Sequence, residues 1–418
     1  MKTGKNMENY ESKAKRNFRL QMFVIALFLA NLSIYTTTYF QNIVLVDIAK
    51  TFKVSIGTMS QLSTLSYLTG IMIGLLLGFL AVRFKHKFLL VLGIACYGLG
   101  TLIYFFAPNF SSVLFSPVFD GIGSGMVGTM IFTLIGESLP LQKRGWIISL
   151  IVSSQFLTNL VVSPATSIIT PAVGWRSVLL WFIFPISMAS LLLCILFIPS
   201  KTHDEQVYTK PEYLKAFKQI LTNKSAIACV IGAVLIGINS ALVVYAVTFF
   251  RTYFSVSLST GAVFGLMASA SGFLGGLIAA RLINRAGRWL LAIVAALFVG
   301  FLQIIFTFIP FVYGSLSFWL TATFFVGVNA ASFVSLILEQ VPDFRGTMMS
   351  LHQSFRSLGL ILGTSISGLI LNLYSNNFHT IMIMFGIAAV AASVILFLFA
   401  KDPTKNQQIN SIRSQQCD

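Results

Sequence analysis

The sequence predicts an all-α polytopic membrane protein built from two pseudo-symmetric bundles of six helices each. The prediction rests on composition, on the spacing of apolar segments and on polar residues that recur between the two halves. Of the 418 residues, 56% are hydrophobic and only 10% are charged, and the mean hydropathy is +0.86. Ordinary soluble domains carry roughly 25% charged residues. So few charges cannot cover a water-exposed surface, and the excess apolar surface must face lipid.

Twelve apolar segments are long enough to cross a bilayer, which takes about 20 residues of helix. In the first half they cover 20–45, 56–81, 88–107, 112–138, 146–170 and 177–198. In the second half they cover 225–250, 259–283, 289–310, 315–338, 347–372 and 379–400. The first segment is longer than a signal-peptide core and has no evident cleavage site, so we expect it to be retained.

Polar segments divide the chain into five parts. These are a tail (1–19), an N-terminal bundle (20–198), a linker (199–224), a C-terminal bundle (225–400) and a second tail (401–418). Most of the 28 Lys and Arg residues fall in the tails, in the linker and in alternate loops, whereas the other side holds only Lys50, Lys53, Arg176 and Arg251. Because basic loops tend to stay in the cytoplasm, both termini and the linker are predicted to be cytoplasmic.

The charge and the cysteines exclude several classes of function. Topology and contact with anionic lipid account for the formal net charge of +16, so nucleic-acid binding is not needed to explain it. The four cysteines show neither a disulfide pattern nor metal-ligand spacing and are expected to be free thiols: Cys96, Cys194, Cys229 and Cys417. We expect no metal and no cofactor.

Polar residues repeat between the halves at one constant spacing. The pairs are Arg83 and Arg285, Glu137 and Glu339, and Pro140 and Pro342, joined by the glycine pairs Gly70 and Gly272, Gly74 and Gly276, and Gly125 and Gly327. Six helices per half make the halves parallel repeats, so a substrate site is expected between them near the membrane midplane.

Loop motifs carry a resemblance to a known family. Gly78 to Lys87 is similar to the Gly-x-x-x-Asp-Arg-x-Gly-Arg-Lys loop of the major facilitator superfamily, with Val82 in place of the acid and Lys85 in place of the glycine. The second copy, Ala280 to Arg288, keeps more of the pattern, including Gly287, with Asn284 in place of the acid. The loop from Glu137 to Gly145, after the fourth span, and the loop from Glu339 to Gly346, after the tenth span, are also similar to the corresponding loops of the family.

The resemblance extends over essentially the whole chain and implies a transporter with a cytoplasmic gate. The residues expected at this gate are Gly78, Arg83, Glu137, Arg144, Arg285, Gly287, Arg288, Glu339 and Arg345. In the loops after the fourth and tenth spans, an acid and a base can pair across the rim, although a loop that only anchors the topology would use the same residues. The Val82 substitution puts in doubt the latch that the family's acid makes.

Two features of the fourth and fifth spans bear on the branch of the family. Pro117 stands where many drug:proton antiporters have an arginine, and Ser163-Pro164 is a degenerate form of the antiporter Gly-Pro signature. The sequence therefore resembles the drug and metabolite:proton antiporters. Its length and its composition are also similar to those of Gram-positive exporters of citrate-based siderophores.

Asp120 is the one acid that lies well inside a span. An ionised carboxylate in the membrane is costly and usually functional, so Asp120 is the candidate for proton coupling. The alternative is that it braces the glycine-rich helix as a hydrogen-bonded group.

Arg356 and His352 lie one turn apart in the eleventh span. Arg356 is expected to pair with Asp120 or to bind an anionic group of the substrate, or else to bond backbone carbonyls at a helix break. His352 could relay protons, or it could be a hydrogen-bonded spacer.

Further polar residues are candidates for the wall of a central cavity, which the first, fourth, seventh and tenth spans line in the resembled family. They are Asn31, Tyr35, Thr38, Asn42, Gln155, Asn159, Asn239, Tyr245 and Asn329. The four in the first span recur at helical period, which indicates a face toward water. Hydrogen bonding between helices would place polar residues inward as well.

These features predict a monomeric secondary transporter of the cell membrane, and not an enzyme. We expect it to export a small molecule, a drug or an endogenous metabolite such as an anionic siderophore, by alternating access in exchange for protons. A proton-coupled importer of a small nutrient is the alternative. A receptor or an enzyme is disfavoured, because the chain shows no nucleotide motif and no conventional catalytic set.

Overall fold

The computed structural model describes residues 2–54, 56–199, 210–373 and 378–403, and the regular structure in these ranges is helical. The first half contains α1 (Lys2–Phe52), α2 (Ile56–Arg83), α3 (His86–Phe106), α4 (Phe110–Val113), α5 (Phe115–Ser138), α6 (Leu141–Val173), α7 (Trp175–Val178), a π-helical turn (Leu179–Ile183) and α8 (Phe184–Phe197). The second half contains α9 (Lys210–Thr222), α10 (Lys224–Ser240), α11 (Leu242–Tyr253), α12 (Leu258–Ala286), α13 (Arg288–Phe306), α14 (Val312–Leu338), a 3-10 turn (Pro342–Phe344), α15 (Arg345–Leu373) and α16 (Phe378–Phe399).

The twelve spans predicted from the sequence are confirmed, since within the described ranges twelve helical stretches are long and apolar enough to cross a membrane. The fourth span combines α4 and α5, the sixth combines α7, the π turn and α8, and the seventh combines α10 and α11. Pro140 and Pro342 lie between consecutive helices, as predicted, because proline cannot donate to the preceding turn.

Three features were not predicted. The first helix begins at Lys2, inside the predicted polar tail, and a further helix, α9, forms in the predicted linker. The seventh span breaks at Ala241. Its N–H donates to the carbonyl oxygens of Ile238 and Asn239 and does not continue the hydrogen-bond pattern of the α-helix. Residues 200–209 of the predicted linker and residues 404–418 of the predicted C-terminal tail lie outside the described residues.

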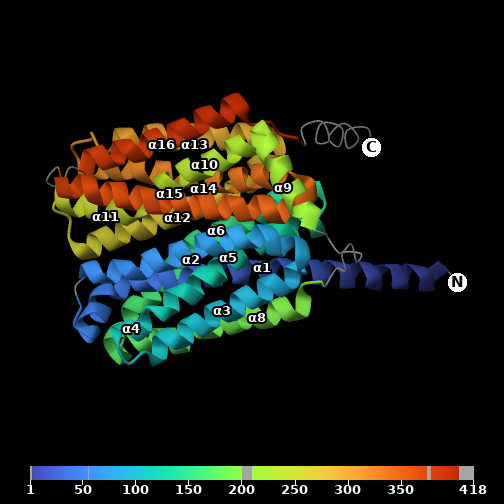
Figure 1. Ribbon diagram of the computed structural model, residues 1–418, viewed down its shortest axis with the longest axis horizontal. Helices are drawn as coiled ribbons and strands as arrows, with labels where there is room; N and C mark the ends of the chain where they lie inside the picture. Colours follow the sequence, from blue (N-terminus) through green and yellow to red (C-terminus); the bar gives the residue numbers. More distant parts are fainter. Residues whose placement is uncertain (1, 55, 200–209, 374–377, 404–418) are drawn as a thin grey trace.

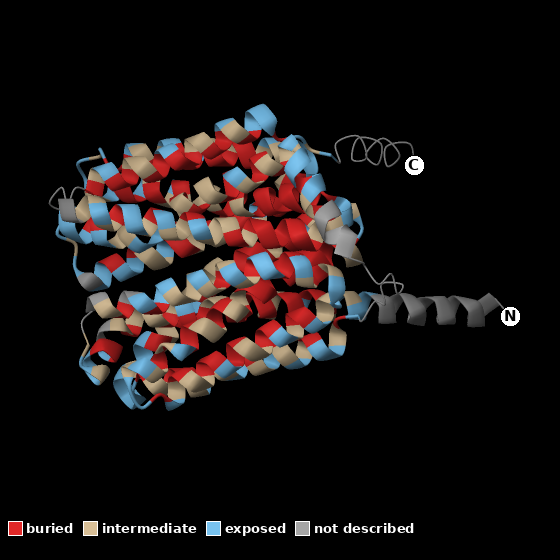
Figure 2. Cartoon of the chain, viewed as in Figure 1, coloured by how far each residue is buried: buried red, intermediate tan, exposed pale blue. Residues whose placement is uncertain are grey.

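The two halves lie side by side with their helices along one direction (Figure 1). Within each half the central helices pack on one another, for example α3 on α5 and α13 on α14, whereas α2 packs on α15 and α6 on α12 across the boundary between halves. The buried residues concentrate near the end that carries α9 (Figure 2). Because the basic loops gather there, we call it the cytoplasmic end.

Glycine pairs that repeat in the sequence form equivalent contacts in the two halves. A methyl group added at Gly125 would lie 3.2 Å from the carbonyl oxygen of Gly70, and one added at Gly327 would overlap the carbonyl oxygen of Gly272. The pairs join α5 to α2 and α14 to α12 at the same place of each repeat. These helices approach closely because neither carries a side chain at the contact.

Replacing Gly327 by alanine is expected to destabilise the protein by about 1–3 kcal/mol, because the methyl group would overpack a backbone contact. The thermal unfolding midpoint of the purified protein in detergent measures the effect. Gly368 is the matched control, because nothing lies within 4 Å of a methyl group added there. Equal midpoints for the two alanine variants would contradict the close approach of α12 and α14.

Candidate functional site

A cavity lies between the two halves, and both halves supply its wall. Its residues include Asn31 and Tyr35 of α1, Gly128 and Phe132 of α5, Val152 and Gln155 of α6, Asn239 and Ser240 of α10, Asn329 and Phe333 of α14, and His352, Gln353 and Arg356 of α15. The empty space between these walls is about 850 Å³, open solvent at its mouth included.

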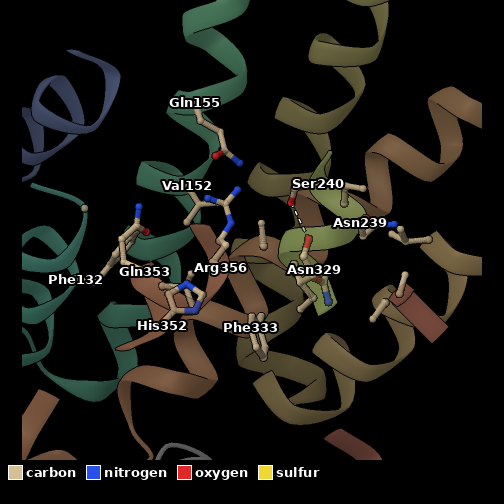
Figure 3. Close-up of a pocket in the computed structure, with 18 of the residues that line it drawn as sticks. Phe132, Val152, Gln155, Asn239, Ser240, Asn329, Phe333, His352, Gln353 and Arg356 are labelled. Carbon is tan, nitrogen blue, oxygen red and sulfur yellow. Dashed lines mark hydrogen bonds between the residues drawn. The ribbon is translucent and has the colours of Figure 1, made fainter. Parts of the chain in front are cut away.

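Arg356 is the cationic residue of the cavity wall. Figure 3 shows its side chain extending from α15 toward Gln155, so an arginine of the second half faces a helix of the first. It also interacts electrostatically with Tyr39 of α1 and Tyr67 of α2. No described carboxylate forms an ion pair with Arg356 within 4.0 Å. Its guanidinium therefore faces the cavity with its charge uncompensated by an acid.

His352 lies one turn before Arg356 and faces the same cavity (Figure 3). Its side chain is buried, its Nδ1 has no hydrogen-bond partner among the described residues, and its ring stands edge-on to Phe333 at 5.7 Å. The adjacent Gln353 packs against Gly128 of α5. This part of α15 thus presents an arginine, an imidazole and an amide to one space.

Three predicted asparagines line the cavity and also bond neighbouring helices. The side-chain amide of Asn31 donates to the carbonyl of Ile151 and to Ser154 Oγ, both at 2.9 Å. That of Asn329 donates to the carbonyl of Ala292 at 2.8 Å. Asn239 donates to Gln303 and to the carbonyl of Phe385. The two interpretations left open by the sequence, cavity wall and interhelical bonding, therefore both describe these residues.

Four residues predicted for the cavity wall lie elsewhere. Thr38 and Asn42 are exposed and lie further along α1, toward the end opposite α9. The amide of Asn159 donates to Ser269 of α12 at 2.7 Å, which joins the two halves. The hydroxyl of Tyr245 donates to the carbonyl of Thr364 at 3.1 Å. A sequence stripe identifies a polar helix face but not the depth at which the cavity begins and ends.

Asp120 is buried at 6% exposure but does not line the cavity. It faces α3, because a methyl group added at Gly100 would lie 2.9 Å from Asp120 Oδ1. The predicted pairing of Asp120 with Arg356 is not found in this conformation. At 100° per residue, the cavity-lining Gly128 and Phe132 are turned by about 80° and 120° from Asp120 around the axis of α5.

The cytoplasmic ends of the two halves are joined around Glu339. This carboxylate is 2% exposed, and its oxygens accept from Arg144 at 2.6 Å and from Arg345 at 3.1 Å, with Arg288 at 3.8 Å. Arg144 belongs to the first half and the others to the second. Arg345 in turn packs against Gly136 of α5. The geometry therefore contains the acid–base pair that was predicted across this rim.

The equivalent acid of the first half has a different partner. Glu137 pairs with His86 at 2.9 Å, and these two residues match Glu339 and Arg288 at the constant spacing of the repeat. The carbonyl of Gly78 accepts from the hydroxyl of Thr347 at 3.1 Å, a further bond across the boundary.

The remaining predicted gate residues play lesser parts in this conformation. Arg83 and Arg285 are exposed, and Arg83 lies 5.9 Å from the ring of Phe84. Gly287 adopts φ +82° between α12 and α13, a backbone conformation that favours glycine. It terminates one helix and begins the next.

The helix α9 covers this closed end. Its Ala216 and Ile220 are buried, and the ring of Phe217 lies 5.3 Å from that of Phe79 of α2. Because α9 also contacts α10 and α15, it touches both halves. Sequence reasoning missed α9, although two apolar side chains four residues apart among charges could have indicated a helix.

Replacing Phe217 by alanine is expected to weaken the closed cytoplasmic end by about 1 kcal/mol, roughly a five-fold change in its population. The rate at which a thiol reagent labels a cysteine introduced at Thr347, which is buried at the boundary between the two halves, measures how often the cytoplasmic end opens. Lys218→Ala, at the exposed neighbouring position, is the control. Faster labelling in both variants, or in neither, would contradict a sealing role for Phe217.

The chain matches solved structures over about nine tenths of its length and curated relatives over less than half of it. The model of the Major Facilitator Superfamily matches residues 27–343 and 320–416. The uncharacterised MFS-type transporter YhcA of Bacillus subtilis (strain 168) is 32% identical over 146 residues, 35% of this chain and 26% of that protein. The lincomycin resistance protein LmrB of the same organism is 26% identical over 207 residues, 48% of this chain and 41% of that protein.

These matches span about a quarter to two fifths of the length of the curated relatives. Among solved structures, the proton:xylose symporter XylE bound to 6-bromo-6-deoxy-D-glucose superposes with a TM-score of 0.77 at 14% identity. The superposition covers 92% of this chain and 97% of that chain. At this identity the likeness shows a shared fold.

Proposed function

The chain belongs to the Major Facilitator Superfamily, and from this premise we propose that it exports a small anionic molecule in exchange for protons. As a member of the family it is a multi-pass secondary transporter and not an enzyme. Alternating access then means that the two halves rock about the central cavity and expose it to one side of the membrane at a time.

The observation that carries this proposal is Arg356, a half-buried arginine of the cavity wall that has no described carboxylate partner. A permanently charged group within a membrane span needs water or a polar partner, and the planar guanidinium matches a carboxylate with two parallel hydrogen bonds. The cavity adds amide and hydroxyl groups from Gln155, Gln353 and Ser240. We therefore propose a polyoxygenated carboxylate as cargo, a class that includes citrate-based siderophores.

The closed cytoplasmic end supports an outward-facing state. The bonds around Glu339 and the contacts of α9 join the halves on that side, whereas Thr38 and Asn42 on the opposite side of the cavity are exposed. In this state the transporter would release cargo outward and take up a proton. Asp120 is the proposed proton carrier, since it is the buried acid of the described membrane spans whose Oδ1 has no partner there.

Export rather than import is proposed on sequence grounds. The Ser163-Pro164 feature resembles the antiporter signature, and LmrB, to which part of the chain is similar, is by name a resistance protein. Neither gives the identity of the cargo, so the test must be untargeted.

The test compares metabolites inside and outside cells that lack the protein with cells that carry the wild type or Asp120→Asn. We expect an anionic compound to accumulate inside the deletion strain, to leave when the wild type is restored, and to be retained with the Asn variant. Normal export by the Asn variant would refute the proton carrier. If the deletion strain instead leaves a nutrient unused in the medium, import would replace export as the proposed direction of transport.

A further inference from the structure

The two acids that correspond between the halves have partners of different kinds. Glu339 lies among three arginines, which carry a charge at any ordinary pH. Glu137 pairs with His86, which stands in the first half where Arg288 stands in the second. Histidine is the side chain whose charge ordinarily changes between about pH 5 and pH 8. The ion pair of the first half therefore depends on a proton, whereas those of the second half do not.

Both ring nitrogens of His86 face hydrogen-bond acceptors. Nε2 lies 2.8 Å from the carbonyl oxygen of Ala81, and Nδ1 lies 2.9 Å from Glu137 Oε1 and 3.0 Å from Oε2. A carbonyl oxygen can only accept, so Nε2 carries a hydrogen and donates it. A neutral imidazole donates from one nitrogen alone. The bond between Nδ1 and Glu137 therefore needs a second proton, which the imidazole and the carboxyl group share.

This proton joins the cytoplasmic ends of three helices. Ala81 lies in the last turn of α2, Glu137 lies in the last turn of α5, and His86 is the first residue of α3. Carbonyl groups in the last turn have no partner within their own helix, and a cation is favoured at a helix C-terminus. A protonated His86 thus bonds the end of α2 to the end of α5.

The second half packs against the same place. A methyl group added at Gly346, the second residue of α15, would lie 2.9 Å from Ala81 Cβ and 3.6 Å from His86 Nε2. On either side of Gly346, Arg345 pairs with the buried acid of the second half and Thr347 donates to a carbonyl of α2. The start of α15 is therefore held against the first half at a surface to which His86 contributes.

The other charges near His86 have different partners. Among the described residues, Glu137 is the titratable group that interacts with the imidazole. Lys87, the next residue of α3, donates to a carbonyl of α8 at 2.7 Å. Arg345 of α15 pairs with Glu339, and the basic side chains of the turn between α2 and α3 are exposed. The protonation of the imidazole is thus governed mainly by Glu137.

We propose that His86 and Glu137 form a cytoplasmic pH sensor, whose bound proton helps to hold the cytoplasmic end of the transporter closed. At low pH the proton is bound, and His86 bonds Ala81 and Glu137 together. As the pH rises the proton leaves, the lone pair of Nδ1 then faces the carboxylate, and the surface under the start of α15 loses its support. Opening toward the cytoplasm is therefore favoured at alkaline pH.

This sensor would regulate the exchange without carrying the exchanged proton. Under the proposed function, each exported molecule admits protons to the cytoplasm. Acid in the cytoplasm would then protonate His86, keep this end closed and slow further proton entry. That consequence rests on the proposed function, whereas the pH dependence of closure follows from the contacts of His86 and does not depend on the direction of transport.

Distances between spin labels test the sensor without knowledge of the cargo. The full chain, with its four native cysteines replaced, is labelled at Gln142→Cys and Arg285→Cys, exposed positions of the two halves, and reconstituted in lipid nanodiscs. From about pH 5.5 to about pH 8.5 the share of the longer distance is expected to rise about five-fold, the size expected of a partly exposed pair. Equal distances at both pH values would overturn the sensor.

Two variants should abolish this response while keeping the cytoplasmic end closed. His86→Arg places a permanent cation beside Glu137, as in the second half. Glu137→Gln offers an amide N–H to the neutral ring, so the bond to Nδ1 no longer needs the second proton. His379→Gln, a histidine among aromatic rings at the other end of the molecule, is the control and should respond as the wild type does. A response that survives in both variants would overturn the proposal.

Magnetic resonance of selectively labelled histidine observes the proton directly. The chain has four histidines, and the signal lost in His86→Arg identifies His86. This ring is expected to carry two protons at acidic pH and one at alkaline pH, with a midpoint that coincides with the change in distance. A ring that stays neutral at acidic pH would overturn the sensor, also where His86→Arg opens the cytoplasmic end by misfolding.

The same distances measured in Asp120→Asn separate the sensor from the proposed proton carrier. The pH response should persist in this variant, because His86 and Glu137 are unchanged. A response lost in Asp120→Asn would assign it to Asp120 and overturn the sensor while leaving proton exchange intact. Normal export by Asp120→Asn, with the response present in the wild type and absent in His86→Arg, would refute the proposed carrier and leave the sensor standing.

Discussion

Replacing Arg356 by glutamine is expected to abolish measurable export while leaving the protein folded. The guanidinium lies in the cavity wall without a described carboxylate partner, so no ion pair within the protein is lost. Truncating one member of a buried charge pair typically costs about 2–5 kcal/mol. For the bound cargo this corresponds to a roughly 30-fold to several thousand-fold loss of affinity.

Export of the compound found by metabolite comparison, with the thermal unfolding midpoint as a control for folding, measures this effect. Arg356→Lys is the matched variant, because it keeps the charge but loses the planar fork. An intermediate defect for lysine is expected from a carboxylate held by two hydrogen bonds. Wild-type export by the glutamine variant would show that the cargo needs no cation here.

Replacing Glu339 by glutamine is expected to separate the cytoplasmic ends of the two halves. The carboxylate is almost completely buried and lies among Arg144, Arg345 and Arg288. Removing one partner of a buried ion pair costs about 3–5 kcal/mol, because the remaining charge is left uncompensated. The arginines would then repel one another across the boundary and favour the inward-facing state.

Spin labels attached at Arg83→Cys and Arg285→Cys, on the exposed loops of the two halves, measure the separation. Glu137→Gln is the control, since Glu137 occupies the equivalent place, is 29% exposed and pairs with His86 within its own half. Partly exposed pairs contribute about 1 kcal/mol or less, so the control should move the labels little. An unchanged distance in the Glu339 variant would mean that α9 and the helix contacts hold this end without it.

The fold could be predicted from the sequence because membrane helices are specified locally. A helix must satisfy its own backbone in lipid, so an apolar segment of sufficient length, such as 289–310, identifies itself without knowledge of its neighbours. The repeat of Glu137 and Glu339 added the relation between the halves. The helix α9 escaped this logic, because its apolar face is short and depends on α2 and α15 for burial.

The cavity could be predicted only in part, for a physical reason visible in α1 and α5. Period in the sequence tells which face of a helix is polar, and two residues of the predicted polar face of α1, Asn31 and Tyr35, lie in the wall. It does not tell which helix that face meets. Asp120 meets α3 rather than the cavity, and Gln353 lines the cavity from a position that no motif identified.

The break in the seventh span gives the outer part of the transporter a degree of freedom of its own. α10 ends at Ser240, beside the cavity, and α11 starts again at Leu242, so the tilt of α11 is not fixed by the hydrogen-bond ladder of α10. One turn before the break, Gly237 lies against the carbonyl of Arg356. Under the proposed function, a solute bound by Arg356 would lie in the same cavity as Ser240, the last residue before this break.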